Sequence, residues 1–278
     1  MNRKINAARI LITAIMFAVS LIMMLPLVWM VSASCKIEQD VFSYPIEWIP
    51  TRWNAIENYT KVILENQFFK NYLNSFIQTG SVVVLSLLLS SVCAYAFAKI
   101  KFKGRDQLFI FLLALMMIPP QLTLIPRFMI IQKMRLYNTL TGLILMEIFS
   151  VYGVFMLRQF MMSIPDSICE SGMMDGAGHV TIFSMIVFPM MKPALATLGI
   201  LKTVWTWNDY QGPMVFLTSK EKFTVQLAVQ QFSQADGMTP IYSLVMTGAV
   251  ISTLPLIILF ILFQSQVIDG IAVGAVKG

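Results

Sequence analysis

The chain has 278 residues, of which 57% are hydrophobic and only 12% charged, and its formal net charge is +6. Soluble domains carry charge on about a quarter of their residues, so this composition excludes an ordinary soluble domain and predicts a surface that faces lipid. The basic residues form no broad patch with interleaved aromatics, which argues against nucleic-acid binding. They lie instead at the edges of apolar segments, as the topology signals of membrane proteins do.

Six apolar stretches are each long enough to cross about 30 Å of hydrocarbon, which takes about 20 residues. They cover residues 10–32, 73–98, 107–129, 139–161, 181–206 and 241–264. The first exceeds the core of a signal peptide and no clear cleavage site follows it, which favours a retained span. The sequence therefore predicts an all-α integral membrane protein with six transmembrane helices in a single domain, residues 1–278.

Prolines interrupt the third and fifth stretches. Pro119, Pro120 and Pro126 lie in the third, and Pro189 and Pro193 in the fifth. A proline lacks the backbone donor that a helix needs and kinks it. Because such a break persists in lipid only where other helices or a wet cavity satisfy the backbone, we expect these two segments to face the protein interior.

Basic residues predict the orientation. They crowd the N-terminus and the hairpin after the second stretch, at Arg3, Lys4, Arg9, Lys99, Lys101, Lys103 and Arg105. The positive-inside rule places both regions in the cytoplasm, and with six spans both termini are then cytoplasmic. Three further bases fall outside, where we expect an interfacial helix from Phe128 to Tyr137. The first outer loop, residues 33–72, holds Tyr44, Trp48 and Trp53, which suit the membrane interface.

No constellation for catalysis or metal binding is visible. The only cysteines and the only histidine are Cys35, Cys93, Cys169 and His179. The predicted topology separates the three cysteines from one another, so they form no disulfide framework, and with a single histidine they have no metal-ligand spacing. No glycine cluster continues into the Gly-Lys-Ser/Thr of a phosphate loop. We therefore predict no catalytic residue, no bound metal or cofactor and no ATP hydrolysis by this chain.

The loop between the fourth and fifth stretches carries a short helix pattern. A proline followed by Asp166, which complements the positive end of a helix dipole, predicts a helix over about 165–175. Ser167 and Glu170 fit a capping box one turn later. Gly176 suits the residue at which such a helix ends. We expect this helix to lie along the cytoplasmic membrane face.

This loop, about residues 163–182, resembles the EAA loop of ABC-importer permeases. The Glu, Gly, Ile and Pro of that pattern fall on Glu170, Gly176, Ile186 and Pro189, and Asp175-Gly176-Ala177 matches its usual Asp-Gly-Ala. Two departures are Ser171-Gly172, where the pattern has Ala-Ala, and Phe188, where it has Leu. Gly172 is expected to loosen the helix by about 1 kcal/mol relative to Ala.

Further motifs extend the resemblance over nearly the whole chain, to the sugar-importer branch with maltose-type permeases. They are Asn71–Ser75, Met116–Pro120, Leu124–Pro126, Leu157–Phe160, Trp207–Tyr210 and the tail Gly270–Gly278. Each match alone is weak, but their order and spacing together are typical of that branch.

The resemblance implies a type I ABC importer permease fold in a bacterial inner membrane. A second homologous permease, two ATP-binding subunits that carry ATP and magnesium, and an extracytoplasmic sugar-binding protein would be its partners. The ATP-binding subunits would dock on a coupling helix with the residues Glu170, Ser171, Gly172, Asp175, Gly176 and Ala177. The tail residues Gly274, Ala275 and Lys277 would contact the same subunits.

Four polar residues are candidates for the substrate path, namely Glu147, Asn74, Asn208 and Asp209. Acids within a membrane are expensive and usually face a cavity or a partner. Glu147 has the alternative of a buried pairing with a base or a hydroxyl. The other three have the alternative of helix capping or interhelical hydrogen bonding.

Three other classes of protein compete with an importer subunit. An ion-coupled secondary transporter usually has inverted repeats and acids near the midplane, whereas we find no repeat and only Glu147 clearly within a span. An intramembrane enzyme needs a catalytic constellation, which is absent. A non-transporting scaffold is separated from an importer by a transport assay and by co-purification with an ATPase. The sequence does not identify the sugar.

Overall fold

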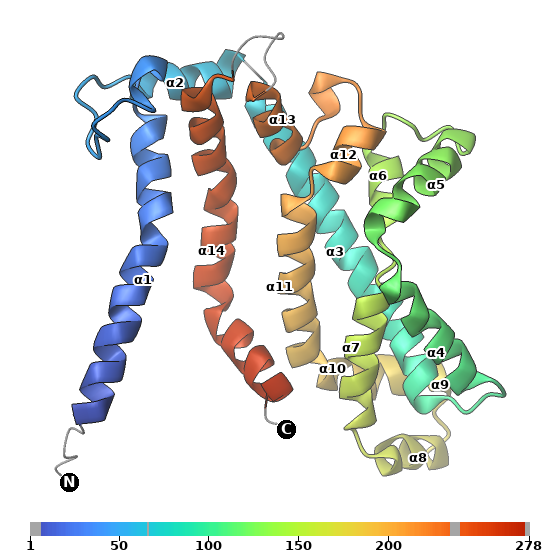
Figure 1. Cartoon of the computed structure of the whole chain (residues 1–278). Coiled ribbons are helices and arrows are strands. Elements are labelled where there is room, and N and C mark those ends of the chain that lie inside the picture. The colour runs from blue at the N-terminus through green and yellow to red at the C-terminus, as the bar shows by residue number, and fades with distance from the viewer. Residues whose placement is uncertain (1–6, 66, 234–239, 276–278) are drawn as a thin grey trace. The chain divides into compact units, whose positions relative to one another are not determined.

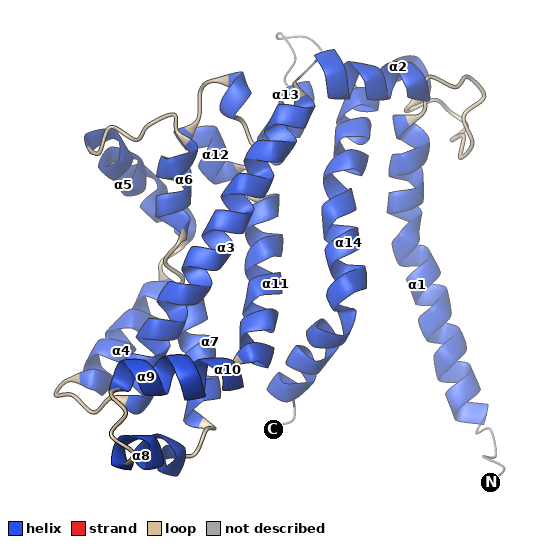
Figure 2. Cartoon of the chain, turned by 180° about the vertical axis from the view of Figure 1, so that it is seen from behind, coloured by secondary structure: helices blue, strands red, loops and turns tan. Residues whose placement is uncertain are grey.

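The protein is described here by a computed structural model that covers residues 7–65, 67–233 and 240–275 (Figure 1). Helices dominate the described residues, and the only β-structure among them is an isolated bridge between Lys36 and Trp53 (Figure 2). The chain divides into two compact units. Unit 1 comprises Met1–Phe69 and Val229–Leu254, and unit 2 comprises Lys70–Ala228 and Pro255–Gly278.

Six apolar segments have the length and composition of membrane spans. Three are continuous, at Ile10–Ser34, Phe68–Lys99 and Tyr242–Gln264. Three more are pairs of helices that qualify together but bend at a break, at Arg105–Lys133, Leu140–Met162 and His179–Asn208. In chain order these six segments match the six predicted stretches, so the structure confirms an all-α integral membrane fold.

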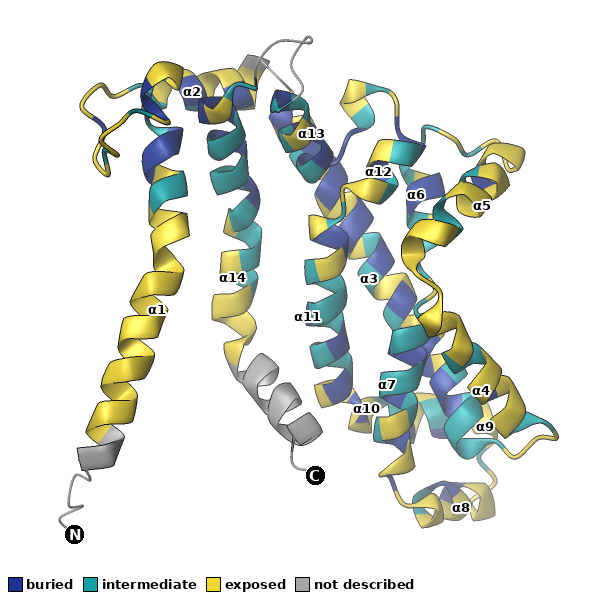
Figure 3. Cartoon of the chain, in the orientation of Figure 1, coloured by how far each residue is buried: buried dark blue, intermediate teal, exposed yellow. Residues whose placement is uncertain are grey.

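Unit 1 is built on the first and last long helices. Its elements are α1 (Ala7–Ser34), the 3₁₀ turn Glu38–Asp40, α2 (Ala55–Thr60), the π-helical turn Lys61–Glu65, the end of α13 (Val225–Phe232) and the first part of α14 (Tyr242–Ala275). The apolar side chains of α1 are exposed along most of its length (Figure 3). Such a helix is stable only where lipid or another protein covers it.

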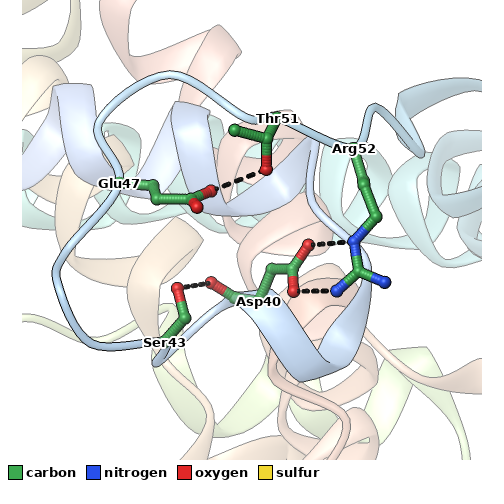
Figure 4. Close-up of polar contacts among 5 residues, drawn as sticks. All are labelled: Asp40, Ser43, Glu47, Thr51 and Arg52. Atoms are coloured by element: carbon green, nitrogen blue, oxygen red, sulfur yellow. Dashed lines mark hydrogen bonds and ion pairs between the residues drawn. The ribbon is translucent and has the colours of Figure 1, made fainter.

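Polar contacts fold the loop between α1 and α2 in unit 1. Asp40 receives two hydrogen bonds from the Arg52 guanidinium, and Glu47 accepts one from Thr51 (Figure 4). The carboxylate of Glu38 accepts the N–H groups of Tyr242 at 2.9 Å and Ser243 at 2.8 Å. Because the first N–H groups of a helix lack partners within it, Glu38 satisfies the N-terminus of α14.

Unit 2 contains the long helix α3 (Phe68–Lys99) and all three bent spans. The remaining helices are α4 (Arg105–Ala114), α5 (Pro120–Lys133), α6 (Leu140–Glu147), α7 (Val151–Met162), α8 (Asp166–Met174), α9 (His179–Ile182), α10 (Phe188–Met190), α11 (Lys192–Asn208), α12 (Gln211–Phe216), the start of α13 and the second part of α14. Short turns join them, including 3₁₀ turns at Leu115–Met117 and Lys220–Lys222 and a π-helical turn at Phe183–Val187. Buried side chains of α3, α7, α8 and α9–α11 form one core cluster, whose fully covered members include Leu157, Met161, Ile182 and Met191.

The structure confirms a break in each of the two proline-containing spans, although Pro126 lies inside the continuous helix α5 and Pro189 inside α10. The third span bends by 102° where Pro119 and Pro120 separate a 3₁₀ turn from α5, and the fifth bends by 75° just before Pro193. The expected interfacial helix from Phe128 to Tyr137 has different bounds. Its residues up to Lys133 belong to α5, which already begins at Pro120, because a proline fits the first turn of a helix.

The fourth span has a break that the sequence analysis missed. It bends by 43° between Glu147, the last residue of α6, and Val151, the first of α7. No proline lies there. Instead the Ser150 hydroxyl accepts the N–H of Gly153 at 3.0 Å and so begins a new helix. The break places the Glu147 carboxylate where the helix ends.

Candidate functional site

The predicted helix in the loop after the fourth span is α8, Asp166–Met174, close to the expected range of 165–175. It lies at one end of unit 2, beyond α7 and beside α9 (Figures 1 and 2). The expected capping box of Ser167 with Glu170 is wrong. The helix already begins after Pro165, so Ser167 lies inside its first turn, and no side chain caps the helix start.

The end of α8 confirms the role expected for Gly176. This glycine has a φ of +82°, a left-handed conformation that side chains with a Cβ disfavour. Its N–H donates to Met173 O, and the N–H of Ala177 donates to Gly172 O, both at 3.0 Å. These two bonds form a Schellman motif, which satisfies carbonyls at the helix end and turns the chain toward α9.

Gly172 packs α8 against the following span. An added Cβ at this position would lie 3.2 Å from Cδ1 of Ile186 and 3.3 Å from Cγ1 of Ile182. Gly172 is buried, so its missing side chain allows a close approach of α8 to α9 and the π-helical turn. The expectation that this glycine only loosens the helix was incomplete, because the same residue brings α8 onto its neighbour.

Lys99 fastens the beginning of α8. Its ammonium, on the last residue of α3, donates to Ile164 O and to Asp166 Oδ1, both at 2.6 Å. Only 3% of the Lys99 side chain is exposed, against 72% of the Asp166 side chain. The hydrogen bond from Lys99 lowers the pKa of the Asp166 carboxyl below its usual value.

The outward face of α8 is open. Glu170, Ser171, Met173, Met174 and Asp175 are exposed, and Met174 retains 88% of its accessible surface. Among the described residues Glu170 has no hydrogen-bond or ion-pair partner. Ala177 is half-buried just beyond the helix. The helix is thus held on its inner side and presents acidic and apolar groups on its outer side.

Two further predictions concern Cys169 and the C-terminal tail. Cys169 is free and buried against the core, and burial raises the pKa of its thiol, so it is an inert packing residue. Of the predicted tail residues, Gly274 and Ala275 lie in the last turn of α14 with side chains that the structure does not describe, and Lys277 lies outside the described residues.

Arg158 joins three helices near α8. Its Nε donates to Phe97 O of α3 at 3.2 Å, and its Cζ lies 3.9 Å from the centre of the Phe109 ring of α4. A terminal nitrogen lies 3.8 Å from Asp106. A planar cation suits this combination of carbonyl, ring and carboxylate. Through Arg158, the motif Leu157–Phe160 thus holds α7 against α3 and α4 by non-covalent contacts.

A second polar site lies around Glu147, at the break between α6 and α7 in the fourth span. Its Oε1 accepts a hydrogen bond from Gln78 at 3.4 Å, and its Oε2 accepts one from Thr206 at 3.1 Å. Lys202 Nζ lies 4.0 Å from Oε2, and the exposed fractions of the Lys202 and Glu147 side chains are 12% and 16%. The alternative of a pairing with a base and a hydroxyl is therefore confirmed in the structure.

The other three path candidates differ in their surroundings. Asp209 and Asn208 line the same cavity as Glu147. Asp209 Oδ1 also accepts the N–H groups of Gln211 at 3.0 Å and Gly212 at 3.3 Å, so it caps α12. Asn74 is not part of this cavity. Its amide donates to the carbonyls of Glu221 at 2.9 Å and Phe223 at 3.0 Å, which ties α3 to the segment before α13.

The sequence analysis missed Lys202, Thr206 and Gln78 as partners of Glu147. Lys202 carried a readable signal, because it is a charged residue inside the fifth apolar stretch and such residues usually pair. The statement that only Glu147 lies clearly within a span is therefore corrected. Gln78, a polar residue within the second stretch, favoured interhelical hydrogen bonding, and its bond to Glu147 bears this out. Thr206 gave no local signal of its own.

Together these features define a polytopic helical membrane protein with a short helix clamped against the fifth span and a charged cavity at the break in the fourth span. Residues 86–272 match the family described as binding-protein-dependent transport system inner membrane component, and the chain belongs to this family. A crystal structure titled as a bacterial ABC transporter involved in the import of the acidic polysaccharide alginate contains a chain that aligns with a TM-score of 0.81, at 23% identity. The alignment covers 95% of this chain and 98% of that one.

Several curated relatives span nearly the full length. The arabinooligosaccharides transport system permease protein AraQ of Bacillus subtilis is 32% identical over 97% of this chain and 96% of its own. The trehalose/maltose transport system permease protein MalG of Thermococcus litoralis is 31% identical with the same coverage. The melibiose/raffinose/stachyose import permease protein MelC of B. subtilis is 30% identical over 91% of each chain. The recognition of a permease of the sugar-importer type is thereby confirmed.

Proposed function

We propose that this chain is one permease subunit of an ATP-driven sugar uptake system, and that it couples transport to ATP hydrolysis through α8. The observation that carries the proposal is that α8 is packed and hydrogen-bonded to unit 2 on one face and exposed on the other. A helix that must pass a movement from one subunit to another needs both properties.

The inner contacts supply a path for that movement. Lys99 holds the beginning of α8, and the Gly176 turn leads directly into α9. Gly172 lies against Ile182 and Ile186 of the bent fifth span. Because packed interfaces shift between discrete arrangements rather than deform continuously, displacement of α8 would move the fifth span with it.

The outer contacts would be made with an ATP-binding subunit. Glu170, Ser171 and Asp175 present a charge, a hydroxyl and a second charge on the exposed face, and Met173 and Met174 add apolar surface. ATP and magnesium belong to two such partner subunits. A second homologous permease would complete the path, and an extracytoplasmic binding protein would deliver the sugar. In this arrangement α8, both termini and the tail with Gly274, Ala275 and Lys277 lie on the cytoplasmic side.

The transported sugar would be a short oligosaccharide, because the relatives are named for oligosaccharide, disaccharide and trisaccharide transport. The substrate path would run past the Glu147 cavity, whose lining also includes Asn208 and Asp209. The structure of this chain contributes the polar lining, and the binding protein contributes selection before entry.

The test compares two α8 variants with an acidic control in the complete complex. Removing one partner of a desolvated charge pair costs about 2–5 kcal/mol, so Glu170→Ala is expected to lose most ATP-binding subunits during purification. Gly176→Leu is expected to retain insertion but to lose sugar-stimulated ATP hydrolysis. Glu57→Ala, an exposed acid in α2, is the control and should behave as wild type.

Three results would contradict the proposal. Wild-type docking and wild-type stimulation in both α8 variants would remove α8 as the coupling element. Sugar uptake driven by an ion gradient without any ATPase would identify a secondary transporter. Failure of the purified complex to transport any sugar, with normal assembly, would favour a scaffold.

A further inference from the structure

A cavity of about 400 Å³ lies in unit 2 between α5, α6, α11 and α12. Small-molecule sites usually have volumes of about 300–1,000 Å³, so a small ligand fits. The side chains that bear on its chemistry are Arg127, Glu147, Lys202, Trp205, Asp209 and Gln211. They come from three separate segments of the chain, which the fold brings to one place.

Two of the charged groups of this cavity, Glu147 and Lys202, are preorganised. The two oxygens of Glu147 are held by Gln78 and Thr206, and Gln78 itself is only 1% exposed. Lys202 reaches the same carboxylate, and both charged side chains are mostly covered. Polar groups that are fixed before a ligand arrives lose little freedom when it binds. This arrangement differs from a pair of surface charges, whose side chains remain mobile.

The formal charges of the lining cancel. The carboxylates of Glu147 and Asp209 are balanced by the cations of Lys202 and Arg127. A charged ligand would leave one net charge without compensation beside the mostly covered side chains of Glu147 and Lys202, which is costly. A neutral ligand leaves the balance intact. The charge count therefore favours an uncharged ligand over an acidic or basic one.

The remaining lining suits a ligand rich in hydroxyl groups. A hydroxyl both donates and accepts, so it can bond to a carboxylate and to an ammonium at once. Trp205 leaves 47% of its surface exposed, and Tyr152 packs edge-on against it with ring centres 5.3 Å apart. A fixed indole beside paired charges offers apolar contact to the C–H face of a sugar ring.

We infer that this cavity is a sugar subsite on the transport path, at which Lys202 donates to, and Glu147 and Asp209 accept from, the hydroxyl groups of an uncharged sugar. Trp205 covers one face of the sugar ring. This inference rests on the proposed function, and it assigns the subsite to this subunit rather than to its partner alone. Lys202 and Trp205 enter as specificity residues that the sequence analysis did not select.

The experiment measures weak sugar binding to the purified complete complex without the binding protein, by saturation-transfer NMR. The neutral probes are arabinotriose, maltose and raffinose, and the acidic probe is a trisaccharide of uronic acids. Lys202→Gln and Trp205→Leu should each weaken binding of the best neutral probe about tenfold. Lys192→Gln, an exposed lysine at the other end of α11, is the matched control and should not change it.

Neutralising these charges one at a time and together separates a binding role from a structural one. Glu147→Gln leaves the lining with one net positive charge and should shift the preference toward the acidic probe. The double variant Glu147→Gln with Lys202→Gln restores the balance and should regain the neutral preference. A purely structural pair would lower assembly without changing the preference between probes.

The outcomes distinguish this inference from the proposed function. Unchanged neutral-probe binding in Lys202→Gln and Trp205→Leu, in complexes that still lose coupling with Glu170→Ala, would overturn the sugar subsite and leave the importer subunit standing. Preference of the wild-type complex for the acidic probe would overturn the neutral class. Absence of both sugar binding and sugar-stimulated ATP hydrolysis in the wild type would overturn both.

Discussion

The ammonium of Lys99 and the carboxylate of Asp166 form an ion pair of 2.6 Å that joins the end of α3 to the first residue of α8. The same ammonium also holds the carbonyl of Ile164 at 2.6 Å, so one cation fixes the chain on both sides of Pro165. Because two of its three donors are used on one short segment, the angle at which α8 leaves α7 is restrained. The lysine that the sequence analysis counted as a topology signal therefore also has a mechanical role.

Asp166→Asn should lower the thermal stability of the detergent-purified complex slightly at pH 7. The carboxyl is exposed, so solvent screening limits the loss to less than about 1 kcal/mol. Since the folded pKa of Asp166 is lowered, its contribution is fully present above the unfolded value of 3.8 and is lost as the pH falls through the folded pKa. The difference in Tm between wild type and variant should therefore shrink below about pH 3.8. A difference that grows on acidification would contradict this assignment.

Arg158→Lys should destabilise unit 2 although the charge is kept. A lysine cannot donate to Phe97 O and stack on the Phe109 ring at the same time, because its ammonium is a point charge. We expect a loss of about 1–3 kcal/mol, seen as a lower Tm and reduced yield of assembled complex. Arg135→Lys, at an exposed arginine in the turn after α5, is the control. Equal melting of both variants would show that the Arg158 contacts contribute nothing.

Two glycines separate backbone conformation from packing at the end of α8. Gly176 has a φ of +82° and Gly178 has a φ of −75°, and an added Cβ would meet no atom within 4 Å at either position. Gly176→Ser should therefore cost about 1–2 kcal/mol, whereas Gly178→Ser should cost little because serine is a good residue at a helix start. Hydrogen exchange of the α8 amides measures the difference. Similar exchange in both variants would remove the left-handed turn as a constraint.

Gly172 gives a prediction about packing alone. Gly172→Ala should be nearly neutral, since the gain of about 1 kcal/mol in helix propensity offsets close contacts with the flexible ends of Ile182 and Ile186. Gly172→Leu should push α8 away from α9 and weaken sugar-stimulated ATP hydrolysis, because that volume is already filled. Measurements of the Tm and of sugar-stimulated ATP hydrolysis in both variants test this prediction. Normal stimulation in the leucine variant would show that close packing here is dispensable.

Local patterns were enough to predict much of this molecule. The six apolar stretches, the proline breaks, the helix at 165–175 and the stop at Gly176 each depend on a few neighbouring residues. Apolar length, a missing donor and a tolerated left-handed φ act within one turn or one span. For that reason the sequence alone located the elements and the loop that carries α8.

The rest depends on residues that are distant in the sequence. Glu147 meets Gln78 and Lys202 across more than fifty positions, and Gly172 meets Ile186 only after the chain has turned back. The break in the fourth span arises from a serine cap, which in sequence looks like any serine within an apolar run. These features are tertiary, so periodicity and spacing could not predict them.

Asn74 provides the last test, because sequence and structure suggest different roles for it. Only 8% of its surface is exposed, and both hydrogens of its amide are used on the carbonyls of Glu221 and Phe223. The neighbouring Ser75 hydroxyl accepts the N–H of Val225 at 2.7 Å, so two adjacent residues of α3 hold one strip of chain. A side chain whose donors are all used in this way has a structural role and leaves no donor for the substrate.

Asn74→Ala should therefore lower stability by about 1–3 kcal/mol, since it leaves buried carbonyls without donors. The KM for sugar in the complex that still assembles should remain that of wild type. Asn208→Ala is the control. Among the described residues the Asn208 amide bonds to Val204 O within its own helix and to Gln226, both near the surface, so the stability of the complex should hardly change. A normal Tm together with a raised KM in Asn74→Ala would show that Asn74 acts in the substrate path and has no structural role in holding the segment before α13.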